Sequence, residues 1–186
     1  MKIIGDRVSI NKGDEQTTIV ISSKIPSWKE SLLAAWIVSW LACLGFFIYE
    51  LFQPHKDNEQ IFIFVMTIFM SYYAFRIIKV YFWRRYGKEY IKITDDDMVY
   101  KRSFRNYGKA HRFFLENIKD ISLITKGDAS ISKALENSFW VMGGEKIAFK
   151  NLEKNYRIGM QLNDNDAISL ASWIEKEINR RLKLKS

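Results

Sequence analysis

Two long, almost uncharged stretches constrain the fold of this chain more than any other feature. Residues 31 to 52, SLLAAWIVSWLACLGFFIYELF, hold one charge, Glu50. Residues 61 to 83, IFIFVMTIFMSYYAFRIIKVYFW, hold only Arg76 and Lys79. As helices, each stretch would be about 33 Å long at ~1.5 Å per residue, enough to cross a hydrocarbon core of about 30 Å. We therefore predict two transmembrane helices.

The eight residues between these stretches, QPHKDNEQ, contain a proline and several turn formers, which indicates a helical hairpin with a short loop. The alternative is a pair of buried helices in a soluble core, but such helices usually alternate with a polar face, and neither stretch has one. In an antiparallel hairpin Glu50 would lie opposite residue 63 and Arg76 opposite residue 37. These charges cannot pair within one hairpin, so we interpret them as anchors at the two membrane surfaces.

Basic residues flank the outer ends of the two predicted helices and are scarce in the connecting loop, where Lys56 stands alone. The positive-inside rule then places both termini in the cytoplasm. The N-terminus has no pattern of a cleaved signal peptide, so we expect no such leader. The predicted interface anchors at the end of the second helix are Arg76, Lys79, Trp83, Arg84 and Arg85.

Small residues recur at helical spacing in both stretches and predict a packing seam. They are Ala35, Ser39 and Cys43 in the first and Thr67, Ser71 and Ala74 in the second. Small side chains let helix backbones approach closely inside a membrane. The seam could join the two helices or receive a partner helix. Cys43 is the only cysteine, and it is interpreted as a packing residue.

After residue 85 the hydrophobic period changes from helical to alternating. The segment EYIKITDDDMVYKR predicts a β-hairpin with its turn at residues 95 to 97, followed by a second turn at FRNYGK. AHRFFLENIKDISLIT is long enough for a strand, a bend and another strand. A polar connection then precedes FWVMGGEKIAFKN, which predicts two strands around Gly143 and Gly144. These patterns predict about seven short strands.

The last segment returns to a helical period. Capping residues from Asn163 to Asp166 open a helix at about residues 164 to 183. Its apolar stripe is Ala167, Leu170, Ala171, Ile174, Ile178 and Leu182. At the other end of the chain, RVSINK and TTIVISSK predict a cytoplasmic strand pair that packs on the same sheet. We thus expect three parts, residues 1–27, 28–84 and 85–186.

This order of parts resembles the bacterial membrane proteins that carry a PH-like domain. The matching features are the acid-rich first turn of GKEYIKITDDDMVYKRSF, the LENIKDI corner, the Gly-Gly turn before KIAF and the closing helix. The resemblance implies a membrane α+β protein of the bacterial inner membrane. In it, a transmembrane hairpin would carry a PH-like antiparallel β-barrel or sandwich capped by the C-terminal helix. Most of that family has no known function, so the resemblance implies a fold more than an activity.

The most concentrated candidate site is YKRSFRNYGKAHR, residues 100 to 112, where basic residues surround a turn with Phe104 and Tyr107 between them. Lysine and arginine suit phosphate because they form charge-assisted hydrogen bonds. The alternatives are a solvated loop that follows the positive-inside bias, contact with anionic lipid, and a site for a protein partner. The candidate lipid or phosphate ligands are Lys101, Arg102, Arg105, Lys109 and Arg112.

Other site types lack the residues they need. The carboxylates of Asp95, Asp96 and Asp97 would diverge in a hairpin turn, and no spaced loop of metal ligands follows them. His55 and His111 would lie on opposite sides of a bilayer. We find no catalytic triad, no phosphate-cradling glycine loop and no nucleic-acid motif. We therefore expect no enzyme activity, no cofactor, no metal and no nucleic-acid partner.

Two functions remain as predictions. In the first, the chain is a non-enzymatic, membrane-anchored binding or scaffolding module that contacts anionic lipid head groups. In the second, it is an accessory subunit of a larger membrane complex, or self-associates, through the hairpin and a sheet edge. The net charge supports the first, since residues 84 to 186 hold 21 Lys and Arg against 14 Asp and Glu.

Overall fold

A computed structural model describes residues 2–124 and 142–185 of the chain. They form two compact units. The sheet unit consists of residues 2–24, 86–124 and 143–185, and the helical unit consists of residues 25–85 together with residue 142. The sheet unit is thus assembled from both ends of the sequence, and the helices are inserted between them.

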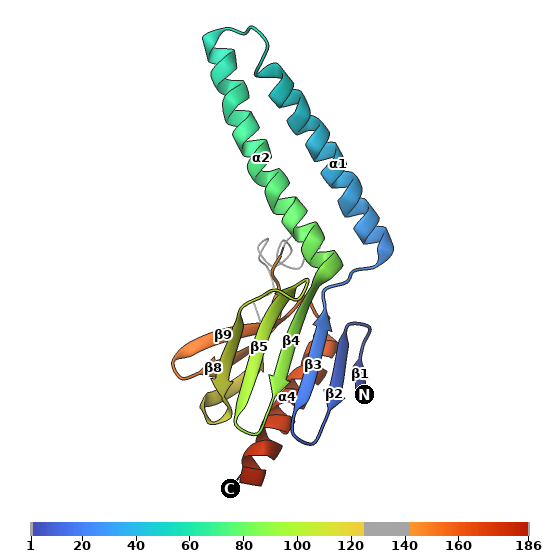
Figure 1. The fold of residues 1–186 in the computed structure, drawn as a ribbon, viewed down its shortest axis with the longest axis vertical. Helices are drawn as coiled ribbons and strands as arrows, with labels where there is room; N and C mark the ends of the chain where they lie inside the picture. The colour runs from blue at the N-terminus through green and yellow to red at the C-terminus, as the bar shows by residue number, and fades with distance from the viewer. Residues whose placement is uncertain (1, 125–141, 186) are drawn as a thin grey trace. The chain divides into compact units, whose positions relative to one another are not determined.

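Six antiparallel strands form the larger sheet of the sheet unit, and they pair in sequence order, as the strands β1 to β5 labelled in Figure 1 show. The N-terminal pair expected from the sequence is present, with one additional strand before it, and β3 pairs with β4 from Thr17↔Ile93 to Ser22↔Lys88. The strands are β1 (Lys2–Ile4), β2 (Val8–Lys12), β3 (Thr17–Ser22), β4 (Gly87–Ile93), β5 (Asp97–Phe104) and β6 (Ala110–Phe114).

Three further strands form a second antiparallel sheet, in the order β7 (Ile118–Leu123), β8 (Glu145–Asn151) and β9 (Lys154–Met160). The short 3-10 turn η1 (Leu115–Asn117) connects β6 to β7 at the corner predicted from LENIKDI. Among the described residues no strand pairing joins the two sheets, so they do not close into a barrel. The strand predicted for residues 139–142, and the connection before it, lie outside the described residues apart from Met142.

The core of the sheet unit is built from alternating positions of both sheets and one face of the last helix. On β4, for example, Ile91 and Ile93 are completely buried, while Lys92 between them is exposed. This alternation follows from the two-residue period of a strand, which directs successive side chains to opposite faces. Phe113, Phe149 and Tyr156 add an aromatic cluster, with Phe113 and Tyr156 ring centroids 4.5 Å apart.

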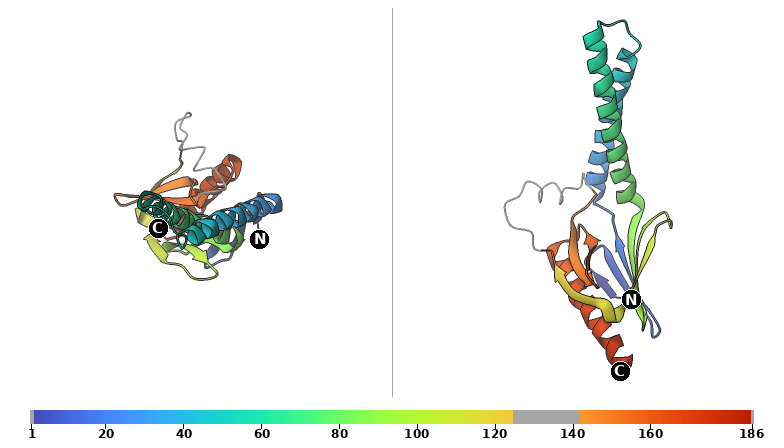
Figure 2. Two further views of the ribbon diagram at one scale, coloured as in Figure 1. Left: turned by 90° about the horizontal axis from the view of Figure 1, so that it is seen from above. Right: turned by 90° about the vertical axis from the view of Figure 1, so that its left-hand side faces the viewer.

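The helix α4 (Asp164–Lys185) packs against β7, β8, β1 and η1, and Figure 2 shows it beside the smaller sheet. Its N-terminus is capped by Asn163, whose side-chain oxygen accepts a 2.6 Å hydrogen bond from the backbone N–H of Asp166. The predicted apolar stripe is confirmed. Its buried members are Ala167, Leu170, Ala171, Ile174 and Ile178, and Leu182 is partly buried against the core.

The C-terminal half of α4 is tied to two turns of the larger sheet by a buried arginine. Arg181 is 1% exposed and forms ion pairs with Glu177 and Asp95, and its Nη1 donates to the backbone oxygen of Glu15. Glu177 in turn accepts a hydrogen bond from the buried hydroxyl of Thr17. A buried charge is stable only when its hydrogen-bonding capacity is satisfied, and this cluster meets that condition.

The helical unit is a hairpin of α1 (Ser27–Glu50) and α2 (Asp57–Tyr86). Both helices are long and apolar enough to cross a membrane by length and composition, and only 6% and 11% of their most apolar windows are buried. The described protein therefore leaves most of these two windows uncovered. Each also begins four residues before the predicted start, and α2 extends through Arg84 and Arg85 to Tyr86.

The register predicted for the hairpin agrees with the contacts between its helices. That register places Trp40 opposite residue 73, and the rings of Trp40 and Tyr73 lie 6.0 Å apart. The indole N–H of Trp40 also donates a 3.0 Å hydrogen bond to the backbone oxygen of Met70. A tryptophan that contributes both packing and a polar contact therefore sets the alignment at mid-hairpin.

Candidate functional site

A buried carboxylate, Glu89 on β4, connects the two sheets and positions the candidate site. Glu89 is 2% exposed and lies on the same face of β4 as Ile91 and Ile93. Its two carboxylate oxygens accept hydrogen bonds from the backbone N–H groups of Gly159 and Met160 on β9, at 2.9 and 3.0 Å. These bonds join the larger sheet to the smaller one and satisfy a charge that would otherwise be costly to bury.

The backbone of β9 is shaped to receive this carboxylate. Gly159 has φ of +74°, a left-handed conformation that glycine adopts without steric cost. Adjacent N–H groups that converge in this way form an anion-binding concavity, which a side chain of the protein itself fills here. A Cβ at position 159 would also lie 3.1 Å from the side chain of Leu162, so both conformation and space favour glycine.

A chain of hydrogen bonds leads from Glu89 to the surface. The Tyr100 hydroxyl donates to Glu89 at 3.0 Å and accepts from Nε of Arg102 at 2.7 Å, and Nη2 of Arg102 donates to Glu145 at 2.7 Å. Burial, together with the nearby Glu89 carboxylate, raises the pKa of Tyr100. Burial lowers the pKa of Arg102, but Tyr100, Glu89 and Glu145 outweigh it and raise that pKa. Tyr100 therefore remains a hydrogen-bond donor and Arg102 a fixed cation.

Where this chain reaches the surface, a cleft of about 360 Å³ opens between the sheets. The larger sheet supplies residues from β5, from β6 and from the segment before β6, and the smaller sheet supplies residues from β8 and β9. We refer to this space as the inter-sheet cleft. Its lining residues are Tyr100, Arg102, Lys109, His111, Glu145, Tyr156 and Arg157.

The electrostatic character of the inter-sheet cleft is basic. Glu145, the one carboxylate among its described lining residues, is paired with Arg102, so these two charges offset one another. The side chains of Lys109 and Arg157 form no hydrogen bond or ion pair with any other described residue. Two cations, one from the connection between β5 and β6 and one from β9, therefore border the cleft without a counter-ion from the described part of the chain.

The structure divides the predicted basic segment instead of gathering it into one site. Arg102 and Lys109 line the inter-sheet cleft. Nζ of Lys101 donates to the backbone oxygen of Asn106, and Arg105 lies over the ring of Tyr86, 4.4 Å from its centroid. Arg112 forms an ion pair with Asp97 on the neighbouring strand. Lys101, Arg105 and Arg112 therefore do not join the other two in the cleft.

The geometry of the β5–β6 connection explains this division. Arg105 and Asn106 both have positive φ, 45° and 74°, and Phe104 and Tyr107 exchange backbone hydrogen bonds across them. This is the two-residue turn that matches the twist of antiparallel strands. Arg105 is thus placed at the tip of the turn, several residues away from the cleft.

Sequence reasoning missed the residues that the smaller sheet contributes to the inter-sheet cleft. Glu145, Tyr156 and Arg157 come from strands of the smaller sheet, far along the chain from residues 100 to 112. Their proximity depends on the inter-sheet contacts of Glu89, which a strand pattern does not reveal. One available signal was Glu89 itself, because a carboxylate in phase with two isoleucines on a strand must be buried and paired.

The acidic turn and the predicted interface anchors also behave in distinct ways. Asp95 pairs with Arg181 and Asp97 with Thr94 and Arg112, so the carboxylates diverge as expected for a polar turn.

The structure leaves Arg76, Lys79 and Arg85 exposed. It buries Trp83 and Arg84, at 6% and 1% exposure, so these two side chains lack the exposed surface that an interface anchor needs.

The small residues of the predicted packing seam on α1 do not lie against α2. Ala35, Ser39 and Cys43 are exposed, and so is Ser71 on α2, whereas Thr67 is half-buried and Ala74 is buried. The less exposed face of α1 instead carries larger residues, because Trp40 must face α2 to reach Met70. Those positions are Leu33, Ile37, Trp40, Leu44 and Phe47.

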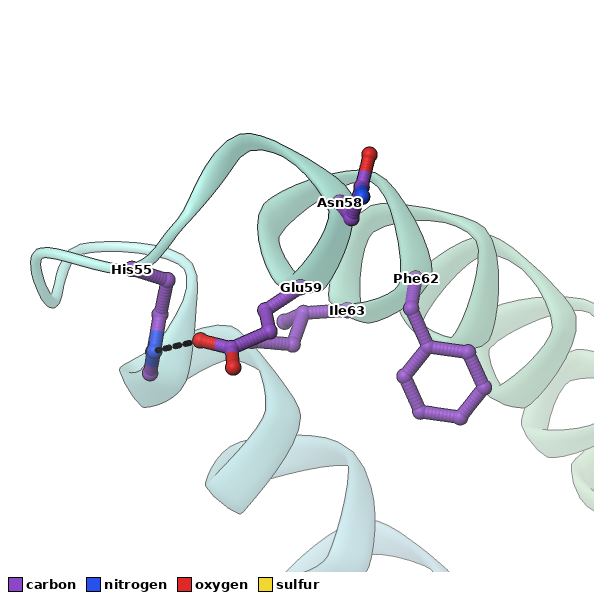
Figure 3. Close-up of a pocket in the computed structure, with 5 residues that line it drawn as sticks. All are labelled: His55, Asn58, Glu59, Phe62 and Ile63. Carbon is purple, nitrogen blue, oxygen red and sulfur yellow. Dashed lines mark ion pairs between the residues drawn. The ribbon is translucent and has the colours of Figure 1, made fainter.

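A second cavity, of about 510 Å³, lies at the loop of the helical hairpin. Figure 3 shows its lining residues His55, Asn58, Glu59, Phe62 and Ile63, with His55 directed toward Glu59 at 4.0 Å. Nε2 of His55 also lies 3.0 Å from Glu50. Among the described residues no group of three or more His, Cys, Asp or Glu side chains has the arrangement of a metal site.

Comparisons with known proteins add no relative. No family model matches the chain, and no match was found among curated proteins or solved structures.

Proposed function

We propose that this chain is a two-pass protein of the bacterial inner membrane, with both termini in the cytoplasm. In this proposal α1 and α2 form a transmembrane hairpin, and the sheet unit is a PH-like, non-enzymatic binding or scaffolding module that contacts anionic lipid head groups. The observation that carries the proposal is the exposure of two long apolar helices, since most of their apolar surface is not covered by the described protein.

The energetic argument for the membrane comes from the size of the exposed apolar surface. Soluble proteins rarely expose contiguous apolar patches beyond a few hundred Å². On α2 alone, Phe62, Phe64, Val65, Ile68 and Phe69 are between 46% and 63% exposed. Lipid removes this surface from water at about 25 cal/mol per Å², which favours insertion.

The argument for lipid head groups comes from charge. Residues 84 to 186 carry a net charge of +7, and α2 ends at Tyr86, directly before β4. Each basic residue near an anionic leaflet contributes about 1 kcal/mol. On the β5–β6 turn, Arg105 and Tyr107 are exposed and suit contact with such a surface.

A reconstitution experiment tests the lipid contact. The full chain is required, because residues 84–186 alone lack three of the six strands of the larger sheet. We expect Lys101→Glu plus Arg105→Glu to accelerate amide exchange in the β5–β6 turn more in anionic vesicles than in neutral ones, where only the loss of the contacts to Asn106 and Tyr86 acts. Lys119→Glu plus Lys150→Glu is the matched control, because these exposed lysines pair across β7 and β8. Equal exchange in anionic and neutral vesicles would exclude the lipid contact.

The second candidate function, an accessory subunit, is favoured by a different observation. The small-residue stripe Ala35, Ser39 and Cys43 faces away from α2, and β6 and β9 each end their sheets among the described strands. Purification of the tagged chain in mild detergent, followed by native mass spectrometry, separates the two functions. A stoichiometric protein partner supports the subunit, and bound anionic lipid without a partner supports the lipid-reading module.

A further inference from the structure

The inter-sheet cleft has the size and the charge of a small-molecule site. Its volume of about 360 Å³ lies within the range of roughly 300–1,000 Å³ that is typical of ligand pockets. Lys109 lines it from the segment before β6, and Arg157 lines it from β9. Like charges that line one concave surface repel, so an anion between them would lower the electrostatic energy.

Arg102 adds a cation that is already held in place. Its Nε and Nη2 are occupied by Tyr100 and Glu145, while no hydrogen bond from its Nη1 to another described residue is present. The side chain is 37% exposed and lines the cleft. A guanidinium fixed by two hydrogen bonds loses little side-chain entropy when it binds an oxyanion.

We propose that the inter-sheet cleft binds a phosphomonoester group. Lys109 and Arg157 contact the phosphate oxygens from opposite sides, Nη1 of Arg102 donates a further hydrogen bond, and the ring of Tyr156 packs on the attached organic part. A phosphomonoester carries close to two negative charges near pH 7, which matches the two cations that lack a counter-ion. A carboxylate carries only one charge and would leave one of them uncompensated.

Two kinds of molecule could supply the phosphomonoester group, a soluble phosphorylated metabolite and a lipid with a terminal phosphate. The site does not depend on the membrane proposal, because every lining residue belongs to the sheet unit. The two proposals therefore fail separately, since a soluble phosphate needs no bilayer in order to bind.

Calorimetric titration of the full chain in an uncharged detergent, with glycerol 3-phosphate as the probe, tests the proposal. We expect Lys109→Met and Arg157→Met each to weaken binding about tenfold, the effect of one charge-assisted contact. Lys154→Met is the matched control, because this exposed lysine lies on the same strand as Arg157 and does not line the cleft. Glu145→Gln should instead strengthen binding, since it removes a carboxylate of the cleft that repels the probe.

Repeating the titration with short-chain phosphatidic acid, and with phosphatidylcholine as its control, distinguishes the two sources. Binding of either phosphate probe that weakens in Lys109→Met and Arg157→Met supports the proposal and names the source. The absence of binding to both probes in the unmodified chain overturns it. Binding that Lys154→Met weakens as much as Lys109→Met also overturns it, because the attraction would then be nonspecific.

Discussion

The two units of the molecule place their apolar residues in opposite ways. In the sheet unit Ile19, Ile91 and Ile147 are completely buried, whereas in the helical unit Ile61 and Ile68 are more than half exposed. The same residue type is covered by protein in one unit and left uncovered in the other. The comparison shows that apolar content alone does not define a core. Whether an isoleucine is buried depends on the spacing of apolar and polar residues around it in the sequence.

Polar groups show the same contrast. In the sheet unit a buried carboxylate receives two backbone N–H groups and a hydroxyl from other strands. In the helical unit the recorded polar contact between the two helices at mid-hairpin is the hydrogen bond from Trp40 to Met70. Interactions distant in sequence therefore hold the sheet unit together, while local backbone bonds within each helix hold the helical unit.

The largest expected effect is the loss of the buried carboxylate. Glu89→Ala should destabilise the sheet unit by about 4 kcal/mol, because the N–H groups of Gly159 and Met160 and the Tyr100 hydroxyl lose their acceptor. Amide exchange of β4 and β9 in the full chain measures this loss. Glu153→Ala, at an exposed position between β8 and β9, is the control. Comparable exchange in both variants would show that Glu89 does not hold the sheets together.

A matched pair of isoleucines sharpens the contrast between the units. Ile174→Ala on α4, where the side chain is 1% exposed, should cost about 3 kcal/mol because it leaves a cavity. Ile68→Ala on α2, where the side chain is 56% exposed, should change stability by less than about 0.5 kcal/mol in detergent. Urea unfolding followed by amide exchange reports both values. Equal costs would mean that Ile68 is covered by protein.

The hydrogen bond between the helices has a smaller expected effect. Trp40→Phe should weaken the contact between α1 and α2 by about 1 kcal/mol. Spin labels at Cys43 and at a cysteine introduced at Ser71, both exposed positions, would then report a broader distance distribution. Trp28→Phe is the control, since the Trp28 side chain is 62% exposed. An unchanged distribution in Trp40→Phe would show that the hydrogen bond does not align the hairpin.

The effect of pH on the stability of the sheet unit should be smaller still, and we expect it only at acidic pH. Burial raises the pKa of Glu177, but hydrogen bonds from Arg180, Thr17 and Arg181 outweigh it and hold that pKa below its ordinary value. The stabilisation is therefore present above the unfolded pKa of about 4.3 and is lost as the pH falls through the folded pKa. Glu177→Gln should flatten this part of the stability profile. An unchanged profile would assign the acid sensitivity to other groups.

Local sequence patterns were sufficient to predict those helices and strands in which apolar residues recur at a regular spacing. The stripe from Ala167 to Leu182 predicted the buried face of α4, and the alternation in EYIKITDDDMVYKR predicted the hairpin of β4 and β5. The β5–β6 turn was also predictable, because it depends on adjacent residues. These features need no knowledge of a partner distant in sequence.

The inter-sheet cleft could not be predicted in the same way, because its two walls meet only in the folded unit. Lys109 was identified as a candidate from its neighbours in sequence, but nothing near Arg157 in the sequence indicates that it would share a cleft with Lys109. The face of α1 that meets α2 could not be predicted for a related reason. The small residues on α1 have helical spacing, but the indole of Trp40 decided which face meets α2.

The pairing of β3 with β4 has a consequence for the order in which the protein is made. During synthesis β1, β2 and β3 emerge first, and the strand that β3 needs follows only after both helices. While the two helices are being synthesised, the backbone groups of β3 that later pair with β4 therefore have no partner strand. If translation paused between residues 24 and 86, the nascent chain would contain only three of the six strands of the larger sheet. A factor that protects the unpaired edge of β3 would then act on the nascent chain.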